Sequence, residues 1–146
     1  MTKFVITAPV WVEKEVVIAL HKAHLAEFGG KEGFVSEAML DSALAKPINR
    51  FNYASPENFS ALVIATLASS YAFGIIKNHP FIDGNKRTSL IVCLLFLRLN
   101  GYSLNSNEEE KYDIFMRLAS NELSEKELSV WLENNLSELP ESFKIL

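Results

Sequence analysis

The stretch that decides the fold is residues 79–87, which read His-Pro-Phe-Ile-Asp-Gly-Asn-Lys-Arg. It lies between two long apolar segments, residues 59–76 and 90–99. A polar stretch between such segments indicates a loop that opens onto a buried helix. Loops held by rigid elements often carry binding and catalytic residues, so residues 79–87 are the candidate site.

The first half of this stretch carries an acid–base group and a carboxylate. His79 precedes a proline, which disfavours the right-handed α conformation for it and restricts where its ring points. Histidine titrates close to neutral pH and can take a proton from a hydroxyl nucleophile as a general base. Phe81 is expected to anchor the loop in the core. Asp83 offers a hard oxygen ligand of the kind that Mg²⁺ prefers.

The second half predicts an anion site. Gly84 permits a positive φ or the close approach of a ligand. A helix that begins at Asn85 presents its first free N–H groups and the positive end of its dipole to the loop. Lys86 and Arg87 add two cations, which at a helix N-terminus cost up to about 1 kcal/mol unless an anion relieves them. A phosphate site and a structural loop with solvated charges both remain open from spacing alone.

The same nine residues resemble the signature of the Fic/Doc (Fido) superfamily, whose Fic form reads His-Pro-Phe-x-(Asp/Glu)-Gly-Asn-Gly-Arg-x-x-Arg. Residues 21–33, with the Phe28-Gly29-Gly30 corner, and residues 94–101 are similar to death-on-curing (Doc) toxins. About the first 105 residues carry the likeness. The resemblance implies a mainly α fold, in which residues 1–146 form one Fic/Doc-type helical bundle with a buried central motif helix and a small β-hairpin flap.

Two departures from the Fic form bear on the reaction. Lys86 stands where the Fic form has glycine, and Leu90 stands at the second arginine. Fic enzymes use the small glycine to seat the α- and β-phosphates of ATP, and they transfer AMP to a target hydroxyl. Doc-like members carry the lysine and bind the nucleotide inverted, with the γ-phosphate facing the histidine. The resemblance therefore implies a kinase-type phosphotransferase.

Carried over to this sequence, the resemblance implies a toxin of a type II toxin–antitoxin system that uses ATP and Mg²⁺. His79 would activate a Ser or Thr hydroxyl on a translation factor, by analogy elongation factor Tu, and Asp83 would bind Mg²⁺. Gly84, Asn85, Lys86 and Arg87 would hold the phosphates. A Phd-like antitoxin would control it. The alternatives are a Fic-type AMP transferase that tolerates Lys86 and a Fic fold retained as a binding module without catalysis.

Composition is consistent with a small enzyme of one domain. The 146 residues carry a net charge of −4 with a pI near 5.4, which argues against a nucleic-acid-binding surface. The single cysteine, Cys93, lies in an apolar run and is expected in the core. No charged leader with an apolar core opens the sequence, and its apolar runs are broken or shorter than the ~20 residues of a membrane span. We expect a cytoplasmic protein without a membrane segment.

Apolar spacing and capping signals predict helices along most of the sequence. The expected helices cover residues 13–28, Ser36 to before Pro47, 56–77 with Ser55 as N-cap, 85–99, a helix capped by Ser106 or Asn107, and a final one from the Ser124 capping box to about 136. Residues 3–7 and 102–104 are expected to form a small strand pair.

Residues 47–55 form the one long connection in this prediction. In Fic/Doc proteins the corresponding segment is a β-hairpin flap that holds the target backbone as an added strand. Phe51 and Tyr53 alternate with polar residues as a short strand would. The residues predicted to bind the target are Asn49, Arg50, Phe51, Asn52 and Tyr53. The alternative is a plain connection between two helices.

Overall fold

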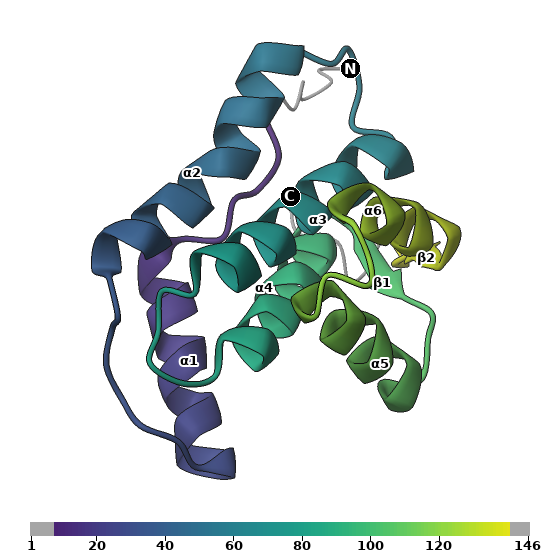
Figure 1. The fold of residues 1–146 in the computed structure, drawn as a ribbon. Helices are drawn as coiled ribbons and strands as arrows, with labels where there is room; N and C mark the ends of the chain where they lie inside the picture. The colour runs from purple at the N-terminus through teal and green to yellow at the C-terminus, as the bar shows by residue number, and fades with distance from the viewer. Residues whose placement is uncertain (1–7, 141–146) are drawn as a thin grey trace.

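Two central helices, α3 (Ala61–Asn78) and α4 (Asn85–Leu99), pack against each other in the middle of the protein (Figure 1). The structure is a computed structural model that describes residues 8–140. Around the central pair lie α1 (Lys14–Phe28), α2 (Glu37–Ala54), α5 (Glu108–Ala119) and α6 (Glu125–Asn134). The expected mainly helical bundle with a central motif helix is therefore confirmed.

The core is built mainly from α3 and α4. Tyr71, Ile75, Val92 and Phe96 are fully buried between the surrounding helices. Within residues 8–140, α3 is the one helix long and apolar enough by composition to cross a membrane, and 61% of it is buried in the protein. Burial of an apolar helix inside a bundle is what a core helix requires.

Capping residues set several helix ends as the sequence predicted. The Asn107 side chain accepts a hydrogen bond from the backbone N–H of Glu110 at 2.7 Å, so Asn107 rather than Ser106 is the N-cap of α5. Ser124 and Glu127 form the expected capping box at the start of α6. Helix α6 ends at Asn134, slightly before the expected position.

Helix α2 differs from its prediction, because it continues through Pro47 to Ala54. A proline inside a helix removes one hydrogen bond and costs about 3 kcal/mol. The buried residues Leu40, Ala43, Leu44, Pro47 and Phe51 nevertheless recur at helical spacing across the proline and face the core. Burial of this continuous apolar stripe outweighs the local cost, so the helix is not broken.

The β-hairpin flap predicted over residues 47–55 is consequently wrong. Asn49, Arg50, Phe51, Asn52 and Tyr53 are all helical. Phe51 is buried, Tyr53 is 95% exposed, and Arg50 pairs with Glu125 of α6 at 2.6 Å. These positions have no strand edge to offer a target.

The start of α3 also differs. Ser55 ends α2 in a left-handed conformation with φ 44°, and Ser60 is the N-cap of α3, accepting a hydrogen bond from Val63 N at 3.3 Å. The segment that was expected to begin α3 is instead the link between two helices.

A small antiparallel sheet closes the far side of the bundle. Strand β1 (Tyr102–Leu104) pairs with β2 (Leu136–Glu138), with Leu104 opposite Leu136. The strand expected at residues 3–7 lies outside the described residues.

Candidate active site

The loop between α3 and α4 is held by one buried amide. The Asn85 side chain accepts a hydrogen bond from Phe81 N at 3.0 Å and donates one to Phe81 O at 2.8 Å. Phe81 is 2% exposed and stacks on Phe34 with ring centroids 5.2 Å apart. Phe81 is thus the anchor that the sequence predicted, and Asn85 fixes it from the first residue of α4.

His21 of α1 also contacts this loop. It was not among the residues predicted to form the site. Its ring lies flat on Phe81, with centroids 3.7 Å apart and planes 10° from parallel. Its Nε2 lies 2.8 Å from the Asp83 backbone oxygen, where it can donate a hydrogen bond. His21 is 3% exposed and shares the buried side of α1 with Val17 and Leu25. A histidine on an otherwise apolar helix face was the available signal.

An extended segment before α2 runs antiparallel to the loop. Val35 N and Ser36 N donate to Pro80 O at 2.7 and 3.1 Å, and Ile82 N donates to Gly33 O at 3.0 Å. Lys31 N donates to Asp83 Oδ2 at 2.7 Å. The backbone beside the candidate site is therefore residues 31–36, whereas the sequence analysis expected residues 47–55 there.

His79 ends α3 in a left-handed conformation, with φ 46° and ψ 55°. Pro80 keeps it out of the right-handed α region, as predicted, but it becomes left-handed rather than extended. A non-glycine residue pays roughly 1–2 kcal/mol for this backbone. Strain of this kind clusters at functional sites. The His79 side chain is exposed and lines the cavity described next.

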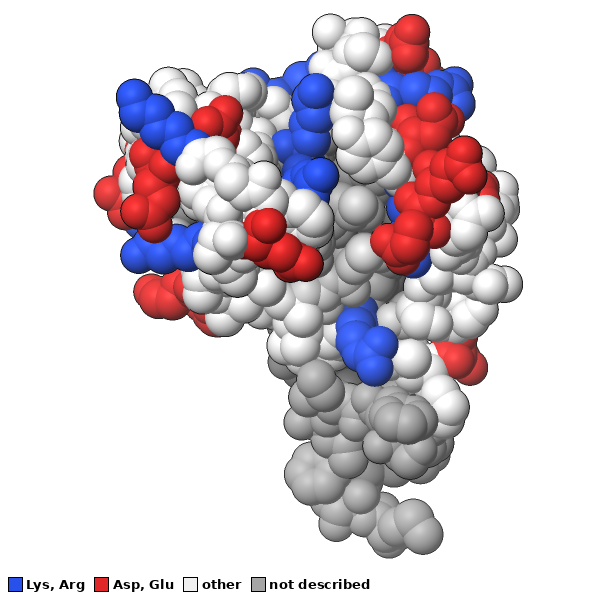
Figure 2. All heavy atoms as spheres, turned by 90° about the horizontal axis from the view of Figure 1, so that it is seen from below, with Lys and Arg blue, Asp and Glu red and all other residues white. Residues whose placement is uncertain are grey.

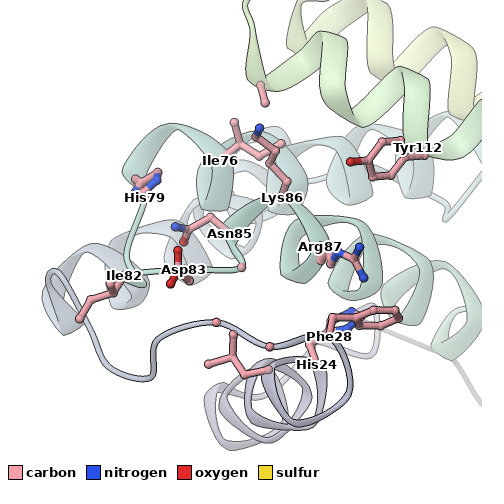
Figure 3. Close-up of a pocket in the computed structure, with 15 residues that line it drawn as sticks. His24, Phe28, Ile76, His79, Ile82, Asp83, Asn85, Lys86, Arg87 and Tyr112 are labelled. Atoms are coloured by element: carbon pink, nitrogen blue, oxygen red, sulfur yellow. The ribbon is translucent and has the colours of Figure 1, made fainter.

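The cavity in front of the loop has a volume of about 640 Å³, within the range of small-molecule sites. Figure 3 shows the residues around it, which come from α1 and the turn after it, the end of α3, the α3–α4 loop, the start of α4, and α5. The lining residues are His24, Leu25, Phe28, Gly29, Gly30, Ile76, His79, Ile82, Asp83, Gly84, Asn85, Lys86, Arg87, Tyr112 and Ala119. The residues predicted to form the site, 79 and 83–87, therefore all line one cavity.

Helix α4 begins at this cavity without a side-chain cap. Its N-cap is Gly84, whose φ of 84° strains any residue with a side chain. The first intrahelical bond runs from Thr88 N to Gly84 O at 2.9 Å, so the N–H groups of residues 85–87 have no helical acceptor. Free amides and the positive dipole end together favour an anion.

Charge is arranged around this helix end in both signs. Lys86 and Arg87 are exposed at the cavity, and the Arg87 guanidinium lies 3.9 Å from the centre of the Phe28 ring. On the face in Figure 2, basic side chains stand beside a hollow in the middle and acidic side chains lie on either side. The two cations Lys86 and Arg87, which line the cavity, suit a ligand with several negative charges.

Comparison with known proteins agrees with these features. The sequence model of the Fic/DOC family matches residues 11–97, which include α1, the loop and most of α4. The chain belongs to the Fic/DOC family. It is also similar to the protein kinase doc of Escherichia phage P1, with 30% identity over 113 residues that cover 77% of this chain and 85% of that protein.

In this Fic/DOC protein some polar groups of the motif hold the loop, and others are left to face a ligand. The side-chain amide of Asn85 makes both of its hydrogen bonds to the Phe81 backbone, so only the backbone N–H of Asn85 faces a ligand. Asp83 has one carboxylate oxygen engaged by Lys31 N, and no further hydrogen bond to its carboxylate is seen within residues 8–140. No three His, Cys, Asp or Glu side chains gather as a metal site in the described part of the chain. A cation at Asp83 would need ligands from the substrate and from water.

Proposed function

We propose that this protein is a kinase-type phosphotransferase, which moves the γ-phosphate of ATP to a Ser or Thr hydroxyl on a protein. The observation that carries the proposal is Lys86, which lies on the uncapped first turn of α4 and lines the cavity. The Fic form has glycine at this position, whereas the similar phage P1 protein is named a protein kinase.

The groups at the cavity can supply the positioning and charge that phosphoryl transfer needs. The amides of residues 85–87, Lys86 and Arg87 hold the phosphate oxygens. His79 takes the proton of the target hydroxyl as its oxygen attacks the γ-phosphorus. The bond from that phosphorus to the β–γ bridging oxygen breaks, and ADP leaves with the electron pair.

Asp83 is the residue that would bind Mg²⁺. The Lys31 N–H donates to Oδ2 of the Asp83 carboxylate and leaves the other carboxylate oxygen to bind a cation. Mg²⁺ typically takes one or two carboxylates together with substrate phosphates and waters, which fits a lone aspartate beside an anion site. When bound, the ion would neutralise charge on the phosphates.

AMP transfer is the alternative reaction. It would need the α- and β-phosphates where the Lys86 side chain now stands at the helix start, and the motif lacks the second arginine because Leu90 stands there. A binding module without catalysis is a weaker alternative, because base, carboxylate and cations all line one cavity.

By analogy with Doc toxins, we propose that the target is a translation factor such as elongation factor Tu, that modification stops translation in the cytoplasm, and that a Phd-like antitoxin controls the protein. The tail of such an antitoxin would fold on binding across the cavity. Expression of the chain alone in bacteria should then arrest growth, and a co-expressed partner should restore it.

The test is to incubate the purified chain with γ-labelled ATP, Mg²⁺ and either a bacterial lysate or purified elongation factor Tu. Label should appear on protein with the wild type and be absent with His79→Ala. A folded wild type that labels no protein and is harmless in several bacterial hosts would contradict the proposal.

A further inference from the structure

The turn that follows α1 lies against the aspartate of the motif. Residues 29–31 read Gly-Gly-Lys. Gly29 and Gly30 line the cavity together with Asp83 (Figure 3), whereas Lys31 is not among the lining residues. Asp83 is exposed, so its carboxylate could take several orientations if no other group held it. The contacts of the turn therefore decide which way this carboxylate points.

A single backbone amide holds the Asp83 side chain. Lys31 N donates to Asp83 Oδ2 at 2.7 Å, and within residues 8–140 this is the one hydrogen bond or ion pair that the carboxylate makes. The backbone oxygen of Asp83 is held separately, because His21 Nε2 lies 2.8 Å from it. The Lys31 amide thus orients the side chain alone and leaves Oδ1 without a partner in the described part of the chain.

Gly30 makes this close approach possible. Its φ is 132°, a backbone conformation that residues with a side chain rarely adopt. A Cβ at this position would lie 2.7 Å from Leu25 Cδ2, 3.4 Å from Asp83 Cβ and 3.8 Å from Asp83 Oδ2. A side chain here would therefore push the turn away from Leu25 or press on the carboxylate. Gly29 also has a positive φ, of 82°, but a Cβ there would meet nothing within 4 Å.

We propose that Gly30 and the Lys31 amide are positioning residues for Asp83, which orient its carboxylate so that Oδ1 can bind the cation that accompanies the phosphates. A carboxylate that is already oriented loses less conformational freedom when a cation binds. Loss of a hydrogen-bond partner of this kind typically lowers metal affinity by about 10–100-fold. The inference rests on the proposed function, because it takes Asp83 to be the residue that binds Mg²⁺.

The experiment measures the binding of ATP to the full chain, once in Mg²⁺ and once in EDTA. Lys31→Pro deletes the amide N–H, and Lys31→Ala is the matched control, because it removes the same side chain and keeps the N–H. Lys31→Pro should raise the Kd for ATP about tenfold in Mg²⁺, at the lower end of the range for a lost partner of a metal ligand. In EDTA the Kd of Lys31→Pro should equal that of Lys31→Ala. Lys31→Ala should keep the wild-type ratio of the two Kd values.

A second pair of variants tests the turn without a proline and decides the matter if Lys31→Pro does not fold. Gly30→Ala should also weaken ATP binding in Mg²⁺ alone. Gly29→Ala is its control, because it places a side chain at a positive φ without meeting any atom. In an Asp83→Ala background, neither Lys31→Pro nor Gly30→Ala should change the Kd further, since the carboxylate that they position is absent.

Any of four results would overturn the inference. The folded variants could bind ATP in Mg²⁺ as their controls do, they could weaken binding equally in Mg²⁺ and in EDTA, their effect could persist without the Asp83 carboxylate, or the wild type could bind ATP equally well in Mg²⁺ and in EDTA. The failure of the proposed function would look different. The expected affinities in a chain that labels no protein from γ-labelled ATP would remove the kinase activity and leave the positioning role standing.

Discussion

At the scale of single residues, His79 combines a strained backbone with an exposed side chain. His79→Asn separates the two, because asparagine tolerates the left-handed conformation but cannot serve as the base. We expect transfer to fall by a factor of ~10²–10⁴ and the thermal midpoint to stay at its wild-type value. Transfer assays and thermal denaturation of both proteins provide the measurement. Wild-type transfer by this variant would remove His79 from the reaction.

His21 provides a second test, because it stacks on Phe81 and can donate a hydrogen bond to the Asp83 backbone oxygen. His21→Phe keeps a flat ring on Phe81 and removes the hydrogen bond to Asp83 O, which should cost about 1–3 kcal/mol of unfolding free energy. Phe81→Ala opens a cavity and should cost more, about 3–5 kcal/mol. Urea denaturation measures both. No loss for His21→Phe would show that the hydrogen bond does not hold the loop.

At the scale of elements, α2 and α3 approach each other closely at Gly74. A Cβ at this position would lie 3.3 Å from Ala43 O and 3.4 Å from Ala43 Cα, which leaves no room for a branched side chain. Gly74→Val should lower the unfolding free energy by about 1–3 kcal/mol. Gly74→Ala should be milder, because alanine gains about 1 kcal/mol of helix propensity over glycine. A valine variant with the wild-type denaturation midpoint would contradict this packing.

The helices that could be predicted from sequence were those with agreeing local signals. Residues 85–99 combine a free helix start with an apolar run, and Ser124 with Glu127 forms a complete capping box. Pro47 did not mark the end of α2, because the free energy that a proline costs inside a helix is smaller than the free energy gained by burying the apolar stripe as far as Phe51. A local rule on proline could not anticipate that balance.

In the candidate site, too, the features with local sequence signals could be predicted and those that depend on distant contacts could not. Residues 79 and 83–87 lie within one stretch of nine residues, so their meeting at one cavity could be predicted from spacing. His21 could not, because its partner is a backbone oxygen 62 residues away and a histidine on an apolar face is more often plain core. The extended segment 31–36 was missed for a similar reason, since three of its hydrogen bonds to the loop join backbone groups, which carry no sequence signal.

At the scale of the whole molecule, the core should weaken in alkali. Burial raises the pKa of the Cys93 thiol from 9.0 and that of the Tyr71 hydroxyl from 10.0, each to about 12. The unfolded chain therefore loses these protons first, so unfolding free energy should fall as pH rises from about 9 towards 12. Cys93→Ala should show a shallower fall than wild type between pH 9 and 10. Identical slopes in urea denaturation would refute the assignment of Cys93 to this effect.

The central claim is that the free start of α4 and Lys86 seat a triphosphate whose terminal phosphate reaches His79. It is tested most directly by comparing γ-labelled and α-labelled ATP in parallel reactions with the purified chain, Mg²⁺ and a bacterial lysate. We predict protein label from the γ-position alone, lost in the His79→Asn control. Protein label from the α-position alone would contradict the account and establish AMP transfer in its place.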